Sequence, residues 1–520
     1  MKTLLINAKV WLEGKSFTEA IGFDSVTGKI IFTGSMQEAD KIKSEYDEVS
    51  DLGKRLVIPS FTDGHCHFIE GALVNSQLNL RNAGTKNDFI KGIRNYKSGN
   101  GNKWIYGGYF SDVNFKEHIV PERNFLDEIC PDIPVIISRF DMHSAFANSK
   151  ALEISGIESK KSLFTNEEIP EINGRLTGEL KERAMYFVMD LIPFPSLKER
   201  TDIAFKEMKK LHSFGITSIS DITLKEDLEV YKELINEGKF LLKTDSRLPF
   251  GEFGNIEMYK TEFKELSSDI KFRSLKAFYD GSLSSKTAYM SSNYKGEKHN
   301  GIKTEYVNSG AFHKAAFEID KAGYQMSVHA IGDKAVEDLL DLNEELIGKN
   351  GKKDRRFRIE HAQHIDKKDF KRFKELNVIA SVQPGHLFSD AKTSFDILED
   401  YTSAHNYRQL SDYGAEICFG TDFPVISENP FETIHIAVTR KVRGFENGFT
   451  PEFGFSVEEC LKAYTSANAY AVFEENERGK LRKGFYADIA VVNQDLFSIN
   501  TDEIKDADVH STYFKGKKVY

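Results

Sequence analysis

The chain has 520 residues, of which 40% are hydrophobic and 29% are charged, and its formal net charge is −10. This composition is typical of a soluble globular protein, and the length is sufficient for more than one domain. The acidic balance argues against nucleic acid as a partner, because phosphate binding requires a basic surface. A membrane is not expected as a partner either, because no run approaches the roughly 20 apolar residues that span a bilayer.

The two ends of the chain predict β-structure. Short strand-like runs separated by Gly, Asn and Asp fill residues 1–60, and the end of the chain has the same pattern. Neither end is long enough to form a sandwich alone. We therefore expect residues 1–56 and 478–520 to form one small β-sandwich domain that the chain leaves and re-enters. The predicted strands are Thr3–Val10, Ala20–Phe23, Lys29–Thr33, Asp488–Val492 and Ser511–Phe514.

The N-terminal run and the cysteines bear on the cellular compartment. Asn7 and Lys9 interrupt the first apolar run, so we interpret it as a strand and not as a signal peptide. The four cysteines are scattered and form no CxxC pair. A reduced, cytoplasmic protein is therefore the expectation.

Between the two ends, strand-like and helix-like segments alternate, which is typical of βαβ units and a parallel sheet. Amphipathic segments such as Asp202–Ser213 and Lys334–Ile347 separate most of the strand candidates. Eight such units predict an α/β fold, a closed (β/α)₈ TIM barrel over residues 57–477. The strand candidates are Arg55–Phe61, Ile216–Asp221, Phe240–Pro249, Phe272–Phe278, Gln325–His329, Phe357–His361, Val378–Gln383 and Glu416–Phe419.

The stretch between the first and second strand candidates is far longer than an ordinary loop. We therefore predict a large insertion, over about residues 70–200, with structure of its own. Because it follows the C-terminal end of a barrel strand, it is expected to lie over the active-site mouth.

The strongest local signal is an apolar strand that ends in His65-Cys66-His67. On an extended chain, residues i and i+2 share one face, so both imidazoles can reach one metal ion at roughly 2.0–2.1 Å. Cys66 is expected to point to the other face and is not counted as a ligand. Two surface histidines at a strand end explain this motif about as well when it is taken alone.

Three more positions extend the set to other strand ends. His329 and His361 close two consecutive strand candidates, and barrel strands deliver their C-terminal residues to one mouth. Asp422 follows the last strand, where a carboxylate can contact both metal and water and transfer a proton. Taken singly, each histidine is more often a hydrogen-bonded structural residue, and Asp422 is more often a turn residue that caps a helix.

Lys276 is unusual because it lies within an apolar strand candidate. A buried lysine is unfavourable unless it is paired or chemically changed. One interpretation is an ion pair with Asp280 or another neighbour. The other interpretation, a chemical modification, rests on resemblance alone.

Together these residues resemble the amidohydrolase superfamily, and within it the metal-dependent hydrolases that include the YtcJ-like proteins and the N-substituted formamide deformylases. The resemblance extends nearly end to end, and the set of motifs in this order is specific although each motif alone is weak. The usual Pro-Gly before the first motif is Pro59-Ser60 here, outside the ligand set. The matching motifs are Pro59–His67, Gly215–Ser218, Lys276 with Asp280–Leu283, Val328–Asp333, Arg358–His361, Ser381–His386, Gly420–Pro424 and Gly484–Asp488.

The resemblance implies a divalent metal centre. His65 and His67 would bind one ion, and His329 and His361 would bind another. Two Zn²⁺ ions are the hypothesis, and a single ion is the alternative. Members of the superfamily differ in this respect.

The resemblance also assigns roles to the remaining two residues. Lys276 would be carboxylated by CO₂ and would bridge the two ions through its carbamate oxygens. Asp422 would be a ligand and also the general base and later the general acid, acting on a metal-activated hydroxide.

Four further residues are candidates for substrate contact. Arg139 and His143 belong to a patch of the insertion, residues 139–143, that resembles one recurring in these relatives. His386 and Asp390 follow the seventh strand candidate and are expected to line the same mouth. Surface or packing roles explain each of the four about as well.

The expected activity is hydrolysis of a C–N bond in a small molecule: an amide, an N-substituted formamide or a cyclic amide. The same metals would serve a deaminase or an ester hydrolase, and the sequence separates these poorly. A non-catalytic scaffold is the alternative from another class, and the presence of the whole candidate ligand set argues against it. A homodimer is an expectation at the level of the family only.

Overall fold

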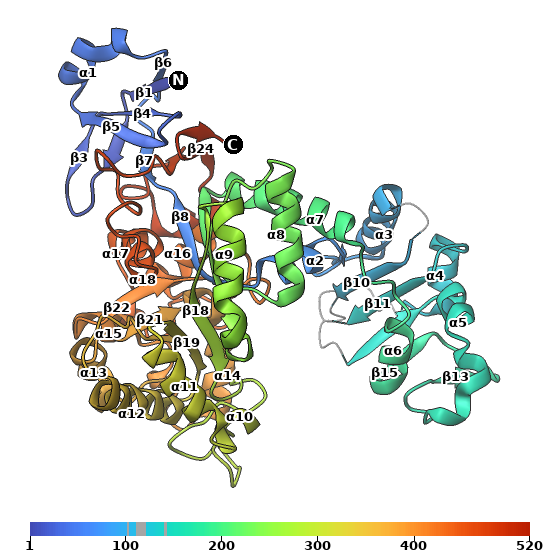
Figure 1. The fold of residues 1–520 in the computed structure, drawn as a ribbon. Helices are drawn as coiled ribbons and strands as arrows, with labels where there is room; N and C mark the ends of the chain where they lie inside the picture. The colour runs from blue at the N-terminus through green and yellow to red at the C-terminus, as the bar shows by residue number, and fades with distance from the viewer. Residues whose placement is uncertain (101–102, 111–120, 140–142) are drawn as a thin grey trace. The chain divides into compact units, whose positions relative to one another are not determined.

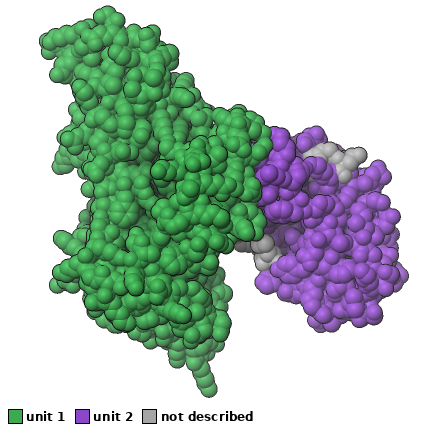
Figure 2. Space-filling view, viewed as in Figure 1, with its two compact units in different colours: residues 1–69, 204–520 green, residues 70–203 purple. Residues whose placement is uncertain are grey.

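The structure is a computed structural model that describes the whole chain except residues 101–102, 111–120 and 140–142. The described residues form two compact units (Figures 1 and 2). Residues 1–69 and 204–520 form the first unit, and residues 70–203 form the second. Within the described ranges, no helix is both long enough and apolar enough to cross a membrane.

The first unit contains an eight-stranded sheet in which all neighbouring strands are parallel and follow one another in chain order. The amide of His67 donates to the Phe423 carbonyl (2.8 Å), and the amide of Asp422 donates to the His65 carbonyl (2.6 Å). The segment after the last strand therefore returns to the first strand, which confirms the predicted TIM barrel. The strands are β8 (Phe61–Cys66), β16 (Ile216–Ile222), β17 (Lys243–Pro249), β18 (Ile270–Phe278), β19 (Gln325–Ala330), β20 (Arg358–His361), β21 (Ile379–Val382) and β22 (Glu416–Phe419).

Helices connect the barrel strands (Figure 1). The predicted helical segments 202–213 and 334–347 lie within α7 and α12 and are confirmed. In α12, Val336, Leu339, Leu340 and Leu346 are buried at helical spacing, so one stripe of this helix faces the core. The helices from α7 onward are α7 (Leu197–Ser213), α8 (Lys225–Asn236), α9 (Ile256–Leu266), α10 (Glu305–Asn308), α11 (Ala311–Lys321), α12 (Asp333–Asn350), α13 (Phe370–Glu375), α14 (Leu387–Ile397), α15 (Tyr407–Asp412), α16 (Pro430–Thr439), α17 (Val457–Tyr464) and α18 (Ser466–Ala471).

The first barrel strand lies later in the chain than the sequence pattern predicts. The predicted strand Arg55–Phe61 is divided between two sheets. β7 (Leu56–Pro59) pairs with β2 (Lys9–Trp11) and β23 (Ile489–Val492) of a terminal sheet, whereas β8 begins at Phe61. Placing residues 57–59 in the barrel was therefore wrong. Only Ser60 separates the two strands, and a continuous apolar run carries no signal that assigns its halves to different sheets.

The N-terminal residues form one terminal sheet in the order β5–β4–β1–β6, and both ends of the chain contribute to a second sheet in the order β25–β24–β23–β7–β2–β3 (Figure 1). One hydrophobic cluster includes Leu5 and Phe23 of the first sheet and Val491 of the second. The predicted strand Thr3–Val10 is split, because Asn7 adopts a left-handed conformation (φ 51°) that asparagine tolerates. The other predicted terminal strands are confirmed. The elements are β1 (Lys2–Ile6), β2 (Lys9–Trp11), β3 (Phe17–Thr18), β4 (Ala20–Asp24), β5 (Lys29–Gly34), α1 (Met36–Ile42), β6 (Glu48–Asp51), β23 (Ile489–Val492), β24 (Val509–Phe514) and β25 (Lys517–Lys518).

The second unit has a five-stranded sheet of its own, in the order β15–β12–β11–β10–β9. Ile137 packs in one hydrophobic cluster and its neighbour Ile136 in another, so apolar side chains cover both faces of this sheet. The elements are β9 (Leu78–Asn79), α3 (Lys86–Asn100), β10 (Ile105–Phe110), α4 (Arg123–Ile129), β11 (Val135–Arg139), β12 (Ser144–Ala147), α5 (Ser149–Ser155), β13 (Glu171–Ile172), β14 (Arg175–Leu176), β15 (Glu179–Lys181) and α6 (Glu182–Met189), and α2 (Phe68–Asn75) crosses the boundary between the units.

Candidate metal centre

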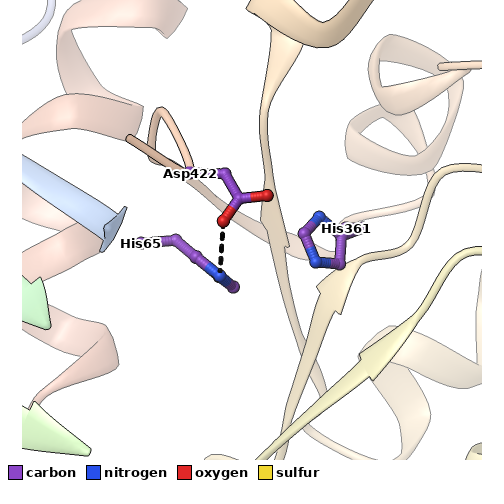
Figure 3. A group of neighbouring side chains, drawn as sticks. All are labelled: His65, His361 and Asp422. Atoms are coloured by element: carbon purple, nitrogen blue, oxygen red, sulfur yellow. Dashed lines mark ion pairs between the residues drawn. The ribbon is translucent and has the colours of Figure 1, made fainter. Parts of the chain in front are cut away.

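Three buried side chains form the middle of the candidate site (Figure 3). His65 lies near the end of β8, His361 ends β20, and Asp422 follows β22. Their candidate ligand atoms all lie within 4.8 Å of one another. Parallel barrel strands place their C-terminal ends at one mouth, which explains why residues so distant in the sequence meet here.

The backbone segments that carry His65 and Asp422 lie unusually close to each other. A Cβ on Gly420 would lie 2.4 Å from the His65 nitrogen, and a Cβ on Gly64 would lie 2.6 Å from the Phe419 carbonyl oxygen. His361 and Asp422 both have positive φ values, 72° and 57°. Such values are sparsely populated by residues other than glycine and are concentrated at functional sites. The left-handed backbone at His361 directs its ring toward His65 and Asp422. The regular alternation of side chains along a strand would not by itself place the ring in this group.

His67 extends the group on the side of β8. The Nε2 atoms of His65 and His67 each lie 3.3 Å from Oδ1 of Asp422. The side chain of His67 is 25% exposed, whereas that of His65 is buried, so His67 lies nearer to solvent. The sulfur of Cys66 lies 3.9 Å from the Ser220 carbonyl oxygen of the neighbouring strand.

His329, near the end of β19, joins the group beside His361. The centroids of these two imidazoles are 4.4 Å apart. Nε2 of His329 lies 3.1 Å from the Gly281 carbonyl oxygen and 3.5 Å from Oδ1 of Asp280. Burial lowers the pKa of His329 to about 3, so the ring is neutral near pH 7. A carbonyl only accepts a hydrogen bond, so Nε2 carries the proton and Nδ1 is left with a lone pair.

The hydrogen bonds of His65 and His361 determine the tautomers of these two rings in the same way. Nδ1 of His65 lies 2.5 Å from Oε2 of Glu360, and Nδ1 of His361 lies 2.8 Å from Oε1 of Gln383. Burial lowers the pKa of both rings. Each neutral ring therefore donates from Nδ1 to an oxygen, and its Nε2 is left as an acceptor.

A cation satisfies this set of acceptors. Oδ1 of Asp422 faces the lone pair on Nε2 of His65 at 3.3 Å, and two acceptors this close repel each other unless a cation lies between them. Imidazole and carboxylate ligands suit zinc and related divalent ions. The residues present therefore fit the predicted divalent metal.

Lys276 is buried within β18, with 3% of its surface exposed. Within the described part of the chain, its Nζ has no hydrogen-bond partner. Burial lowers the pKa of Lys276 to about 8, and its charge in turn lowers the pKa of His329. Asp280 accepts instead from the amides of Ile331 (3.0 Å) and Gly332 (2.9 Å), so it is engaged elsewhere and does not supply the partner that the ion-pair interpretation required.

Sequence reasoning missed a charged layer beneath the site. Glu360 is fully buried and accepts from Ser327 (2.6 Å), Arg358 (2.9 Å) and Arg247 (3.3 Å) through Oε1. Although burial opposes its charge, Arg358 and Arg247 hold the pKa of Glu360 well below its usual value. The available signal was in β20, where Arg358 and Glu360 occupy alternate positions and so share one face of the strand.

Two of the predicted substrate residues lie in the first unit. Nε2 of His386 is 3.7 Å from Oδ2 of Asp422. The carboxylate of Asp390 accepts from Gln363 (3.0 Å) and lies 3.6 Å from Nε2 of His405. His386 therefore borders the candidate centre directly, whereas Asp390 belongs to a neighbouring polar group.

The other two predicted substrate residues lie in the second unit. Nδ1 of His143 is 3.0 Å from Glu182, and the side chain of His143 is largely exposed. Arg139 lies over the ring of Phe146 and 3.9 Å from Glu179. Residues 140–142 of the same predicted patch lie outside the described residues. A role of Arg139 and His143 at the metal centre stays a prediction.

Comparisons with known proteins agree with this geometry. The family described as "Amidohydrolase family" matches residues 48–520. The chain is 29% identical to Protein LONG AFTER FAR-RED 3 of Arabidopsis thaliana (99% of this chain and 91% of that protein), 26% identical to YtcJ of Bacillus subtilis (98% and 97%), and 23% identical to the N-substituted formamide deformylase of Arthrobacter pascens (94% and 93%). A crystal structure of a metal-dependent hydrolase from Pyrococcus horikoshii superposes with a TM-score of 0.76 at 24% identity, covering 96% of this chain and 99% of that one, and so has the same fold.

Proposed function

The chain belongs to the amidohydrolase family of hydrolases, and on this premise we propose that it cleaves a C–N bond in a small amide, an N-substituted formamide or a cyclic amide. One observation carries the proposal. Lone pairs of neutral, buried imidazoles and the carboxylate of Asp422 converge on one point at the barrel mouth. The formamide deformylase of Arthrobacter pascens, similar over nearly its whole length, supports a C–N bond as the target.

In this proposal two Zn²⁺ ions occupy the centre. When bound, they supply Lewis acidity, which polarises a carbonyl and makes a water nucleophilic near neutral pH. His65 and His67 would hold one ion, and His329 and His361 would hold the other. The tautomers described above support this assignment, because each buried imidazole already presents a lone pair.

Lys276 is proposed to carry a carbamate. Its neutral amine attacks CO₂, a bond forms between Nζ and carbon, and one proton leaves for solvent. The product has negatively charged oxygens in place of a cation, which is the chemistry required of a ligand that bridges two metal ions. The buried Nζ of Lys276, which has no hydrogen-bond partner among the described residues, supports the proposal, since the carbamate would give this position polar partners.

Asp422 is proposed to move the proton. Oδ1 is directed toward His65 and His67, whereas Oδ2 lies on the side of His386. Oδ2 accepts a proton from the attacking water and returns it to the leaving nitrogen. Oδ1 remains a ligand. His386 contacts the substrate or the charge that develops on it.

The two terminal sheets are proposed to form a β-sandwich domain, and the unit of residues 70–203 is proposed to be an insertion in the barrel. Arg139 and His143 are proposed to contact the substrate. The four cysteines are buried and free, which supports the cytoplasm as the site of action.

The test combines metal analysis with turnover. Protein purified without chelator is expected to contain two zinc ions per chain, and a panel of N-formyl and N-acyl compounds is expected to include a substrate. Asp422→Asn should lower turnover at least 10²-fold, the lower end of typical general acid–base contributions. Loss of turnover with metal retained supports the enzyme. Absence of turnover by the wild-type chain on every amide would favour the scaffold, and a single ion with unmodified Lys276 would remove the bridge.

A further inference from the structure

The interior of this barrel is charged below the metal centre, where barrel interiors are normally filled by apolar side chains. Arg247 of β17, together with Arg358 and Glu360 of β20, is completely buried. Asp245 lies 3.4 Å from the Arg247 guanidinium. We call Arg247, Arg358 and Glu360 the charged layer.

Stability alone does not account for such a layer. Replacing a buried ion network by apolar side chains of similar volume is often neutral or stabilising, because desolvation of the charges offsets their attraction. A network of this kind is better explained by the orientation that its hydrogen bonds give to a neighbouring side chain, which apolar residues cannot provide. Its contacts show which residue it positions.

The two carboxylate oxygens of Glu360 have different hydrogen-bond partners. Oε1 accepts from Ser327, Arg358 and Arg247, and these three contacts hold the carboxylate in place. Among the described residues, the only hydrogen bond that Oε2 accepts comes from Nδ1 of His65, at 2.5 Å. The orientation and the tautomer of the His65 ring therefore depend on an oxygen whose position three other donors determine.

The arginines hold the same residue from the backbone side. Arg247 and Arg358 each donate to the carbonyl oxygen of Gly64, both at 2.9 Å. Gly64 immediately precedes His65. The charged layer thus contacts the first histidine both through its ring and through the peptide bond that precedes it.

We propose that Glu360 is a positioning residue for metal binding, which, held by Arg247 and Arg358, fixes the ring of His65 with its Nε2 lone pair directed at the metal. This inference rests on the proposed function, because it assigns His65 as a ligand. It predicts that the layer contributes to metal affinity beyond its effect on folding.

The experiment measures Zn²⁺ affinity by competition with a chelator, and thermal stability of the metal-free protein, for the full chain. Glu360→Gln removes the charge with little change in size. Removing the partner of a metal-bound histidine typically weakens affinity 10–100-fold, and that is the expected result here.

A matched control separates positioning from loss of stability. Asp320 of α11 is also buried and paired with an arginine, since Arg355 donates to it at 2.8 and 3.2 Å, but it lies outside the barrel interior. Asp320→Asn should destabilise the metal-free protein and leave Zn²⁺ affinity within about twofold of wild type. Equal affinities for Glu360→Gln and wild type, or equal losses in both variants, would overturn the inference.

A second variant decides the question if Glu360→Gln does not fold. Ser327→Ala removes one hydrogen bond to Oε1 and leaves every charge in place. It should weaken Zn²⁺ binding several-fold, and unchanged affinity would overturn the inference. If wild-type protein itself binds no Zn²⁺, the proposed function fails first, and that outcome is distinct from a variant that binds as wild type does.

Discussion

At the scale of residues, the ligand set could be predicted because its members stand at strand ends in recognisable motifs. The supporting residues could not. Glu360 could be noticed only because it shares a strand face with Arg358, and Gln383 carries no signal by itself. The importance of both depends on which nitrogen of a distant histidine they contact. The role of His361 depends on its left-handed backbone, which sequence spacing does not reveal. Tautomers and orphaned atoms are properties of the packed site and not of the chain.

Gly420 gives a direct test of how closely β8 and β22 must approach. A Cβ at this position would lie 2.4 Å from the His65 nitrogen and 2.8 Å from its Cβ, so Gly420→Ala must push the two strands apart. We expect a loss of about 1–3 kcal/mol in the free energy of unfolding, as for other overpacked positions, together with weaker Zn²⁺ binding. Urea unfolding and chelator competition measure the two effects.

Gly254 is the matched control for that substitution. A Cβ there meets no atom of the described chain within 4 Å, so Gly254→Ala should change neither quantity measurably. Wild-type stability and affinity in Gly420→Ala would show that the two strand ends have more room than the structure gives them.

At the scale of elements, most barrel strands could be predicted within a few residues, because apolar runs and amphipathic segments alternate along the chain. The first strand could not. The run from Leu56 onward contains both β7 and β8, and these strands belong to different sheets. Pairing partners decide such a case, and they lie more than 100 residues away in β16 and more than 400 away in β23. The local pattern of hydrophobic residues therefore does not indicate which sheet each of the two strands joins.

The end of α7 predicts a pH dependence of stability. His212 is 2% exposed, its Nε2 donates to the Leu241 carbonyl at 2.8 Å, and burial lowers its pKa to about 4. Between pH 6.5 and 4, His212 binds a proton in the unfolded chain but not in the folded chain. Stability therefore falls as the pH falls. The contribution of this group is on the order of 2–3 kcal/mol over that range.

Removing the imidazole should remove this component. His212→Gln retains an amide that can donate to Leu241 but does not titrate. Urea unfolding of both proteins at several values between pH 4.5 and 7 gives the comparison, and the stability of the variant should fall less steeply toward acid. Parallel curves for the two proteins would mean that His212 is protonated in the folded state as readily as in the unfolded one.

At the scale of the whole molecule, the barrel and the contribution of both chain ends to one region could be predicted from the order of elements. The second unit could be predicted only as a long insertion with its own structure. Its five-stranded sheet is stabilised by apolar packing on both faces. The pattern of apolar and polar residues along such short, interrupted strands does not predict this packing. The proposed function depends on the convergence of widely separated segments of the chain on the candidate metal centre.

Anomalous X-ray scattering at the zinc edge, from crystals of protein purified without chelator and supplied with Zn²⁺, tests this convergence most directly. The account predicts scattering peaks within coordination distance of His65, His361 and Asp422, with His67 and His329 as further ligands and extra density on Lys276. Fully occupied zinc bound elsewhere, with these imidazoles free of metal, would contradict it.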